Sequence, residues 1–229
     1  MPSPLLEGHG LPCFEQITPD LVQQDIPVLL SQLEQQFTEL ETTLQSRLDS
    51  GASISWDEVM QPMQRIGERL RWSWGVISHL NGVCNSTELR EAHAAQQPEV
   101  VRLSNRLGQS KVLHQVLCRL RDEPSEPLSA TRQRILDSEL LSMQQRGVGL
   151  DGEHQIAFNQ ASERLAALST SFGNHVLDAT QQWTLKLTNP EQVQGLPKRA
   201  LEALAAAARD SGDAEASADE GPWLLGLDM

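Results

Sequence analysis

The chain has 229 residues, enough for one large domain or two small ones, and 39% of them are hydrophobic. Leu, Ala and Gln are abundant, whereas there are four Phe, five Trp and no Tyr, a balance that favours helices over a sheet. The formal net charge of −13, with no basic patch in the sequence, argues against nucleic acid as a partner.

The sequence also argues against a membrane partner and against a disulfide framework. There is no signal-peptide pattern at the N-terminus and no apolar run long enough to cross a bilayer, so a soluble, cytoplasmic protein is expected. Three cysteines, Cys13, Cys84 and Cys118, are odd in number and lie far apart. They predict reduced, structural thiols and no zinc knuckle.

The first predicted elements are an arm and a long helix. Residues 1–17 are rich in Pro and Gly and predict an extended arm docked on a helical body. Thr18 is the expected N-cap of the first helix, with Pro19 at its first position. A stripe that requires a partner follows at spacings of three and four, and consists of Ile26, Leu29, Leu30, Leu33, Phe37, Leu40, Leu44 and Leu48.

Two further helical stretches follow. Ser55 and Glu58 have the spacing of a capping box, which predicts the start of a second helix. After turns at Asn-Gly and Asn-Ser pairs, residues 87–121 are predicted to be helical, with breaks near Pro98 and Gly108.

Another helix is predicted between Ser129, as N-cap, and Gly147, as a stop signal. The best-defined helix then runs from about Glu153 to Thr180. Its apolar stripe consists of Ala157, Ala161, Leu165, Leu168, Phe172 and Val176.

The C-terminal part predicts two short strands and one short helix. Residues 183–187 alternate like a strand, and an alanine-rich helix follows Pro197. Crowded acidic residues at 209–221 predict a solvated linker, and 222–229 predict the start of a strand whose only available partner is 183–187. Because native proteins avoid an unpaired apolar edge, the end of the chain is expected to be a truncation.

Together these patterns predict an all-α or predominantly α fold, bundle-like and antiparallel, with two short strands near the C-terminus. The expected organisation is an arm at 1–17, a helical domain at 18–208, the linker at 209–221 and the truncated strand at 222–229.

The sequence supplies no catalytic, cofactor-binding or metal-binding residues that can be identified by spacing. Helical zinc sites need two His one turn apart, whereas Glu153-His154 is followed by Ala157 and Phe158. Gly-x-Ser-x-Gly and phosphate-loop patterns are absent as well. The remaining histidines lie far from one another in the sequence, at His9, His79, His93, His114 and His175.

Several segments, in order along nearly the whole chain, resemble the zinc-dependent oligopeptidases, which include oligopeptidase A, thimet oligopeptidase and neurolysin. The similarity is greatest to the bacterial oligopeptidase A branch. The matching segments are Pro4-Leu5-Leu6, Leu11-Pro12-Cys13-Phe14, Ile17-Thr18-Pro19-Asp20, Trp56-Asp57-Glu58, Ser78-His79-Leu80-Asn81, Asn85 to Arg90, Gly147 to Leu150, Leu168 to Thr180, Trp183, Gly195-Leu196-Pro197 and Leu224 to Asp228.

The resemblance implies a helical N-terminal region that forms one wall of a channel through which short peptides reach a zinc ion. In the family, a His-Glu-x-x-His helix binds that zinc, and its Glu acts as general base. No residue of this chain corresponds to that helix, so zinc belongs to the full-length family and none is expected to be bound here. The leading hypothesis is therefore an inactive N-terminal portion of a metallopeptidase. The alternative is a stand-alone helical module that docks onto peptides or onto a separate catalytic chain.

Overall fold

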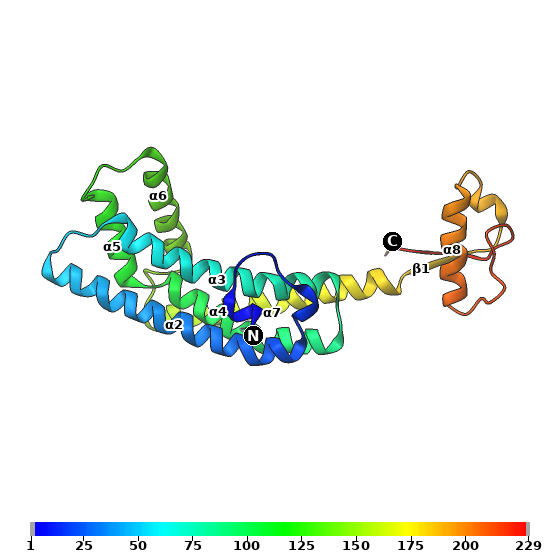
Figure 1. The fold of residues 1–229 in the computed structure, drawn as a ribbon, viewed down its shortest axis with the longest axis horizontal. Helices are drawn as coiled ribbons and strands as arrows, with labels where there is room; N and C mark the ends of the chain where they lie inside the picture. The colour runs from blue at the N-terminus through cyan, green and yellow to red at the C-terminus, as the bar shows by residue number, and fades with distance from the viewer. Residues whose placement is uncertain (1–2, 228–229) are drawn as a thin grey trace. The chain divides into compact units, whose positions relative to one another are not determined.

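The computed structural model describes residues 3–227 and is built mainly of helices (Figure 1). This confirms the predicted fold class, including two short strands near the C-terminus. The elements are α1 (Pro4–Glu7), η1 (Phe14–Gln16), α2 (Pro19–Ser50), α3 (Trp56–Val83), α4 (Thr87–Gly108), α5 (Lys111–Asp122), α6 (Ala130–Gln145), α7 (Gly152–Gln182), β1 (Thr184–Leu187), η2 (Pro190–Val193), α8 (Lys198–Asp210) and β2 (Trp223–Gly226).

The described residues divide into two compact units. Unit 1 ends at Ser169 and unit 2 begins at Thr170, so the division falls within the continuous helix α7. Within residues 3–227, no helix combines the length and the apolar character needed to span a membrane.

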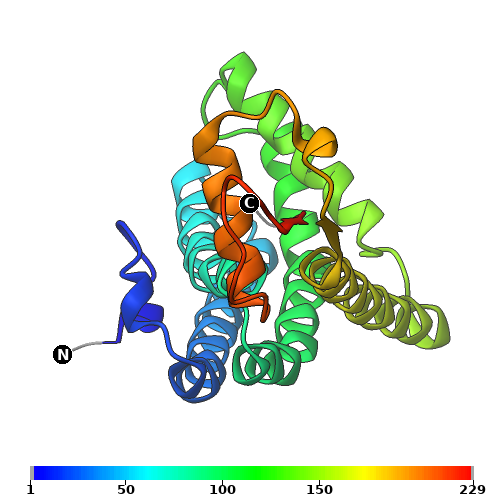
Figure 2. The same cartoon turned by 90° about the vertical axis from the view of Figure 1, so that its right-hand side faces the viewer.

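Helix α2 forms the centre of unit 1, where it lies beside α3 and α4 (Figures 1 and 2). Thr18 caps it as predicted, because its hydroxyl accepts a hydrogen bond from the Leu21 amide at 3.2 Å. Gly51 ends it in the left-handed conformation, with φ of 68°. Its predicted stripe is buried against neighbouring helices through Ile26, Leu29, Leu30, Leu33, Phe37, Leu40 and Leu44.

The other helix starts of unit 1 follow from local hydrogen bonds. Ser55 and Glu58 form the predicted capping box: the Ser55 amide donates to the Glu58 carboxylate at 2.8 Å. Ser129 caps α6 as predicted, and α4 ends at Gly108, also as predicted.

The predicted break at Pro98 is wrong, because α4 continues through it. A proline inside a helix costs about 3 kcal/mol locally. On either side of it, however, α4 buries Ala92 and Leu103 in the core shared with α2. Pro98 itself is exposed, so the helix carbonyl that loses its amide partner lies on the solvent side. Burial of the two flanking segments therefore outweighs the local penalty.

The described part of the N-terminal arm, from Ser3 onward, lies on α2 and α3 and contains two short helical segments, α1 and η1, that its composition does not predict. Leu5 is completely buried, and its carbonyl accepts a hydrogen bond from the Ser73 hydroxyl at 2.6 Å. The indole of Trp72 donates to the Gly10 carbonyl at 2.9 Å. Polar bonds from α3 therefore fix the arm at its apolar anchor, Leu5, and again at Gly10.

Unit 2 contains the two strands, paired antiparallel with Thr184 opposite Gly226 and Leu187 opposite Trp223. This confirms the pairing predicted for the two strand segments, although residues 228–229 of the second lie outside the described residues. Trp223 is 1% exposed and forms the centre of a small core with Val193, Leu204, Ala205, Ala208 and Ala216.

The acidic segment at 209–221 includes the last two residues of α8 and leads towards β2. Ala216, in its middle, is buried in the core of unit 2, and the Arg209 guanidinium donates to the Ala216 carbonyl at 2.6 Å. Its acidic side chains at Asp210, Glu215, Asp219 and Glu220 are exposed.

The docking of the arm gives a first prediction. Leu5→Ala should lower the free energy of unfolding of unit 1 by about 2–5 kcal/mol, because it removes a completely buried side chain. Leu11→Ala, at a position that is 94% exposed in the same arm, should change it by less than about 0.5 kcal/mol. Urea denaturation followed by circular dichroism measures both. Equal effects of the two substitutions would contradict the docked arm.

Candidate functional site

The histidines do not come together in the folded chain. Across residues 3–227, no group of three or more His, Cys, Asp and Glu side chains is placed to hold a metal ion. His93 is buried in α4 and stacks on Trp74 with ring centroids 4.5 Å apart. Burial lowers the pKa of His93, which favours its neutral form. This histidine therefore serves packing.

The other histidines have separate surroundings. The ring of His79 lies against Phe14 of η1, with centroids 5.6 Å apart. His114 lies one turn from Cys118, with Nδ1 3.9 Å from the thiol sulfur, while His154 and His175 are exposed on α7. Trp72 and Trp74 of α3 also have different partners, the arm and His93, because positions two apart on a helix face different directions.

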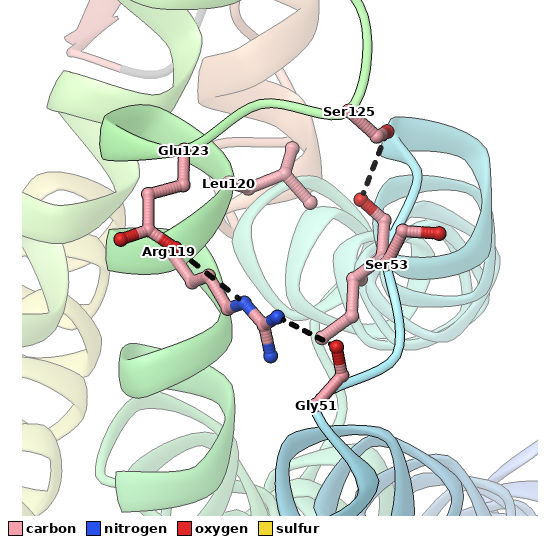
Figure 3. A pocket seen from close by; sticks show the side chains of 7 residues that line it. Gly51, Ser53, Arg119, Leu120, Glu123 and Ser125 are labelled. Atoms are coloured by element: carbon pink, nitrogen blue, oxygen red, sulfur yellow. Dashed lines mark hydrogen bonds and ion pairs between the residues drawn. The ribbon is translucent and has the colours of Figure 1, made fainter.

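A pocket of about 160 Å³ lies where the segment after α2 meets the end of α5 (Figure 3). The Arg119 guanidinium donates to the Gly51 carbonyl at 3.1 Å and lies 4.0 Å from the Glu123 carboxylate. The Ser125 hydroxyl donates to the Ile54 carbonyl at 3.3 Å. The polar groups of this pocket therefore bond to one another and join the loop after α2 to α5.

Two ion pairs connect α2 to α4. Arg102 donates through both terminal nitrogens to Glu34, at 3.1 and 3.2 Å. One turn further along α4, Arg106 makes the same forked contact with Glu41, and the Ser110 hydroxyl donates to the same carboxylate. The second pair is the more enclosed one, since the Glu41 side chain is only 14% exposed.

The arginine partners lower the pKa of both carboxylates, Glu34 and Glu41. The hydrogen bond from Arg102 is the largest influence on Glu34 and lowers its pKa. For Glu41, desolvation by burial acts to raise the pKa, but the hydrogen bonds from Arg106 and Ser110, with the arginine charge, outweigh it and leave the pKa lowered. Both carboxylates are therefore ionised structural groups. No short-range sequence pattern indicates this pairing, because the partners lie 65 or more residues apart.

The two pairs give a matched prediction. Glu41→Ala should lower the free energy of unfolding by about 1–3 kcal/mol, because it leaves Arg106 and Ser110 without their acceptor. Glu34→Ala, in the more exposed pair, should cost at most about 1 kcal/mol.

The lowered pKa of Glu41 means that its contribution is present above the pKa of an unfolded Glu and is lost as the pH falls through the folded pKa. The Glu41→Ala chain should therefore lose less stability than the unchanged chain on acidification from pH 6 to roughly pH 3. Urea denaturation at both pH values measures this. Parallel pH dependence of the two chains would contradict the assigned role.

Helix α7 exposes a row of large apolar side chains. All of its residues are described, and none of its side chains is buried. Leu165 is 66% exposed, Leu168 48%, Phe172 72% and Val176 48%. At 3.6 residues per turn, these four side chains fall within a sector of about 80°. We call them the α7 stripe.

The comparisons with known proteins cover almost the whole chain. Residues 26–155 match the family model described as Neurolysin/Thimet oligopeptidase, N-terminal domain. The chain belongs to this oligopeptidase family. The match extends from the first turns of α2 into the start of α7.

Full-length relatives give the same assignment. The chain is 35% identical over 227 residues to the probable cytosolic oligopeptidase A of Arabidopsis thaliana, covering 99% of this chain and 31% of that protein. It is 34% identical over 227 residues to the organellar oligopeptidase A of the same plant, covering 99% of this chain and 28% of that protein. It is 32% identical over 230 residues to oligopeptidase A of Escherichia coli, covering 100% of this chain and 32% of that protein. The chain thus spans about a third of the length of these relatives.

Proposed function

We propose that this chain is the N-terminal, channel-wall region of an oligopeptidase A-like zinc metallopeptidase that hydrolyses short peptides. The observation that carries the proposal is the match to oligopeptidase A proteins over 99% to 100% of this chain but only about a third of theirs. On this proposal unit 1 supplies a rigid helical wall, and peptide hydrolysis takes place on residues that the matched third does not contain.

The zinc expected in such an enzyme does not fit the residues described here. Residues 3–227 offer no grouped His, Cys, Asp or Glu donors, and the buried His93 is taken up by stacking on Trp74. A metal site needs several donors that converge on one point. We therefore assign no catalytic step to this chain, whose contribution is to shape the channel and to exclude bulky substrates.

Substrate class and location are part of the same proposal. Short peptides are the expected substrates of the whole enzyme, because the relatives are named oligopeptidases. A cytoplasmic location is supported by the name of one relative, a probable cytosolic oligopeptidase A, while another relative is organellar.

A second candidate function is a separate helical module that docks onto a catalytic chain. The observation that favours it is the α7 stripe, an apolar helix face that remains exposed in this chain. In both candidates the chain acts by contact with a catalytic part and performs no hydrolysis alone.

A replacement experiment tests the proposed function. In a chimera, residues 1–229 would take the place of the matching N-terminal third of Escherichia coli oligopeptidase A. The chimera should hydrolyse a quenched fluorescent peptide within about tenfold of the parent rate, in a chelator-sensitive manner, and the 229-residue chain alone should not.

Two outcomes would contradict the proposal. One is robust, chelator-sensitive hydrolysis by the 229-residue chain alone. The other is a chimera that folds, as judged by circular dichroism and a cooperative thermal transition, but has no peptidase activity. The parent enzyme with its own N-terminal third serves as the control.

A further inference from the structure

One face of α7 makes polar contacts, whereas another face exposes apolar side chains. Its polar face bonds to unit 1: the Gln109 side chain donates to the Asn159 side chain at 2.8 Å, and Gln155 donates to Gln109 at 3.0 Å. Gln97 donates to the Ala166 carbonyl at 3.3 Å. These contacts lie about a third of a turn away from the α7 stripe. The part of α7 that belongs to unit 1 is thus held by these polar contacts, whereas the four side chains of the α7 stripe are exposed.

An exposed apolar helix face such as the α7 stripe is favourably buried against a partner. Water contact with large apolar side chains costs about 25 cal/mol per Å². Single exposed apolar residues are ordinary on protein surfaces, whereas four at helical spacing on one face mark an interaction site. Leu165, Leu168, Phe172 and Val176 satisfy this description.

A second copy of this chain fits poorly. Four side chains that are half to three-quarters exposed present on the order of 400 Å². Pairing two copies of the stripe would then bury on the order of 800 Å² in total, whereas stable interfaces bury about 1,200–2,000 Å². The stripe alone is therefore too small for a stable dimer of free chains.

A partner on the same polypeptide fits better. A tethered segment meets its site at an effective concentration in the millimolar range, so a small apolar contact is enough to hold it. The relatives have such segments, because the chain covers only 31%, 28% and 32% of three of them. More than half of each relative is therefore available to cover the stripe.

We infer that the α7 stripe is the docking surface for the part of an oligopeptidase A-type polypeptide that follows the matched region. This inference rests on the proposed function and adds to it the face through which the helical wall meets the rest of the enzyme. The contact is apolar, and its strength comes from burying Leu165, Leu168, Phe172 and Val176.

The test compares the same substitutions in two contexts. The stripe variant is Leu168→Glu with Phe172→Glu. The matched control is Gln160→Glu with Ser171→Glu, which adds the same charge at exposed positions about 100° away on the same helix. Each pair is placed in the 229-residue chain and in the chimera with Escherichia coli oligopeptidase A, and Tm is measured by calorimetry.

In the 229-residue chain, both variants should leave Tm unchanged within about 2 °C, because both sites are exposed there. In the chimera, the stripe variant should lower Tm by roughly 5 °C or more, and the control should not. Equal Tm values of stripe variant and control in a folded chimera would overturn the inference. A dimer of the 229-residue chain that only the stripe variant disperses, seen by light scattering, would also overturn it.

A second readout covers a chimera that does not fold. The remaining two-thirds of Escherichia coli oligopeptidase A, made as a separate chain whose folding is first verified by circular dichroism and a cooperative thermal transition, should bind the 229-residue chain, and the stripe variant should weaken binding at least tenfold relative to the control. Absence of binding, or equal binding by the two variants, overturns the inference. Peptidase activity reports separately on the proposed function: a folded, stripe-dependent chimera without activity would refute the function and leave the docking surface in place.

Discussion

Burial of the apolar face of α2 is the interaction on which unit 1 depends. This helix packs against α1, α3, α4 and α5, and its buried Leu29, Leu33 and Phe37 are almost completely removed from solvent. Full burial of each such side chain contributes about 1.5–3 kcal/mol, more than any exposed ion pair of the structure. The α2–α4 ion pairs and the polar bonds to the arm then fix the alignment of helices that apolar burial has already brought together.

Helix α7 has an apolar stripe at the same spacing as that of α2, but its stripe is exposed. Both helices have a stripe at spacings of three and four, yet the stripe of α2 is buried and that of α7 is exposed. The difference lies in the polar side: Asn159 and Gln155 bond to Gln109, which itself is buried at the end of α4. Amide side chains therefore hold the part of α7 that belongs to unit 1. The proposed role as a helical wall is consistent with this, since such a wall needs one face for its own core and another for the rest of the enzyme.

Local signals made much of the fold predictable. Thr18, Ser55 and Ser129 are caps where the sequence placed them, because a cap depends on residues only three positions away. The helix break predicted at Pro98 is wrong because burial of apolar residues on both sides of it outweighs the local penalty of a proline. A stripe on α7 was predictable, but its exposure was not, because periodicity indicates that a helix needs a partner and does not identify that partner. Likewise, the bond between Glu41 and Arg106 joins residues 65 positions apart, and no short-range pattern reports it.

The structure combines a buried apolar core around α2 with an apolar face of α7 that is exposed in this chain, and we infer that this face is covered by a partner outside it. Amide hydrogen exchange of the 229-residue chain, read by mass spectrometry, tests this most directly, because local protection follows burial and packing. Peptides from residues 26–44 of α2 should exchange only through global unfolding. Peptides from residues 165–176 of α7 should exchange at least about a hundredfold faster, through local opening. Protection of α7 equal to that of α2 would contradict the account, since it would mean that the stripe already has its partner within this chain.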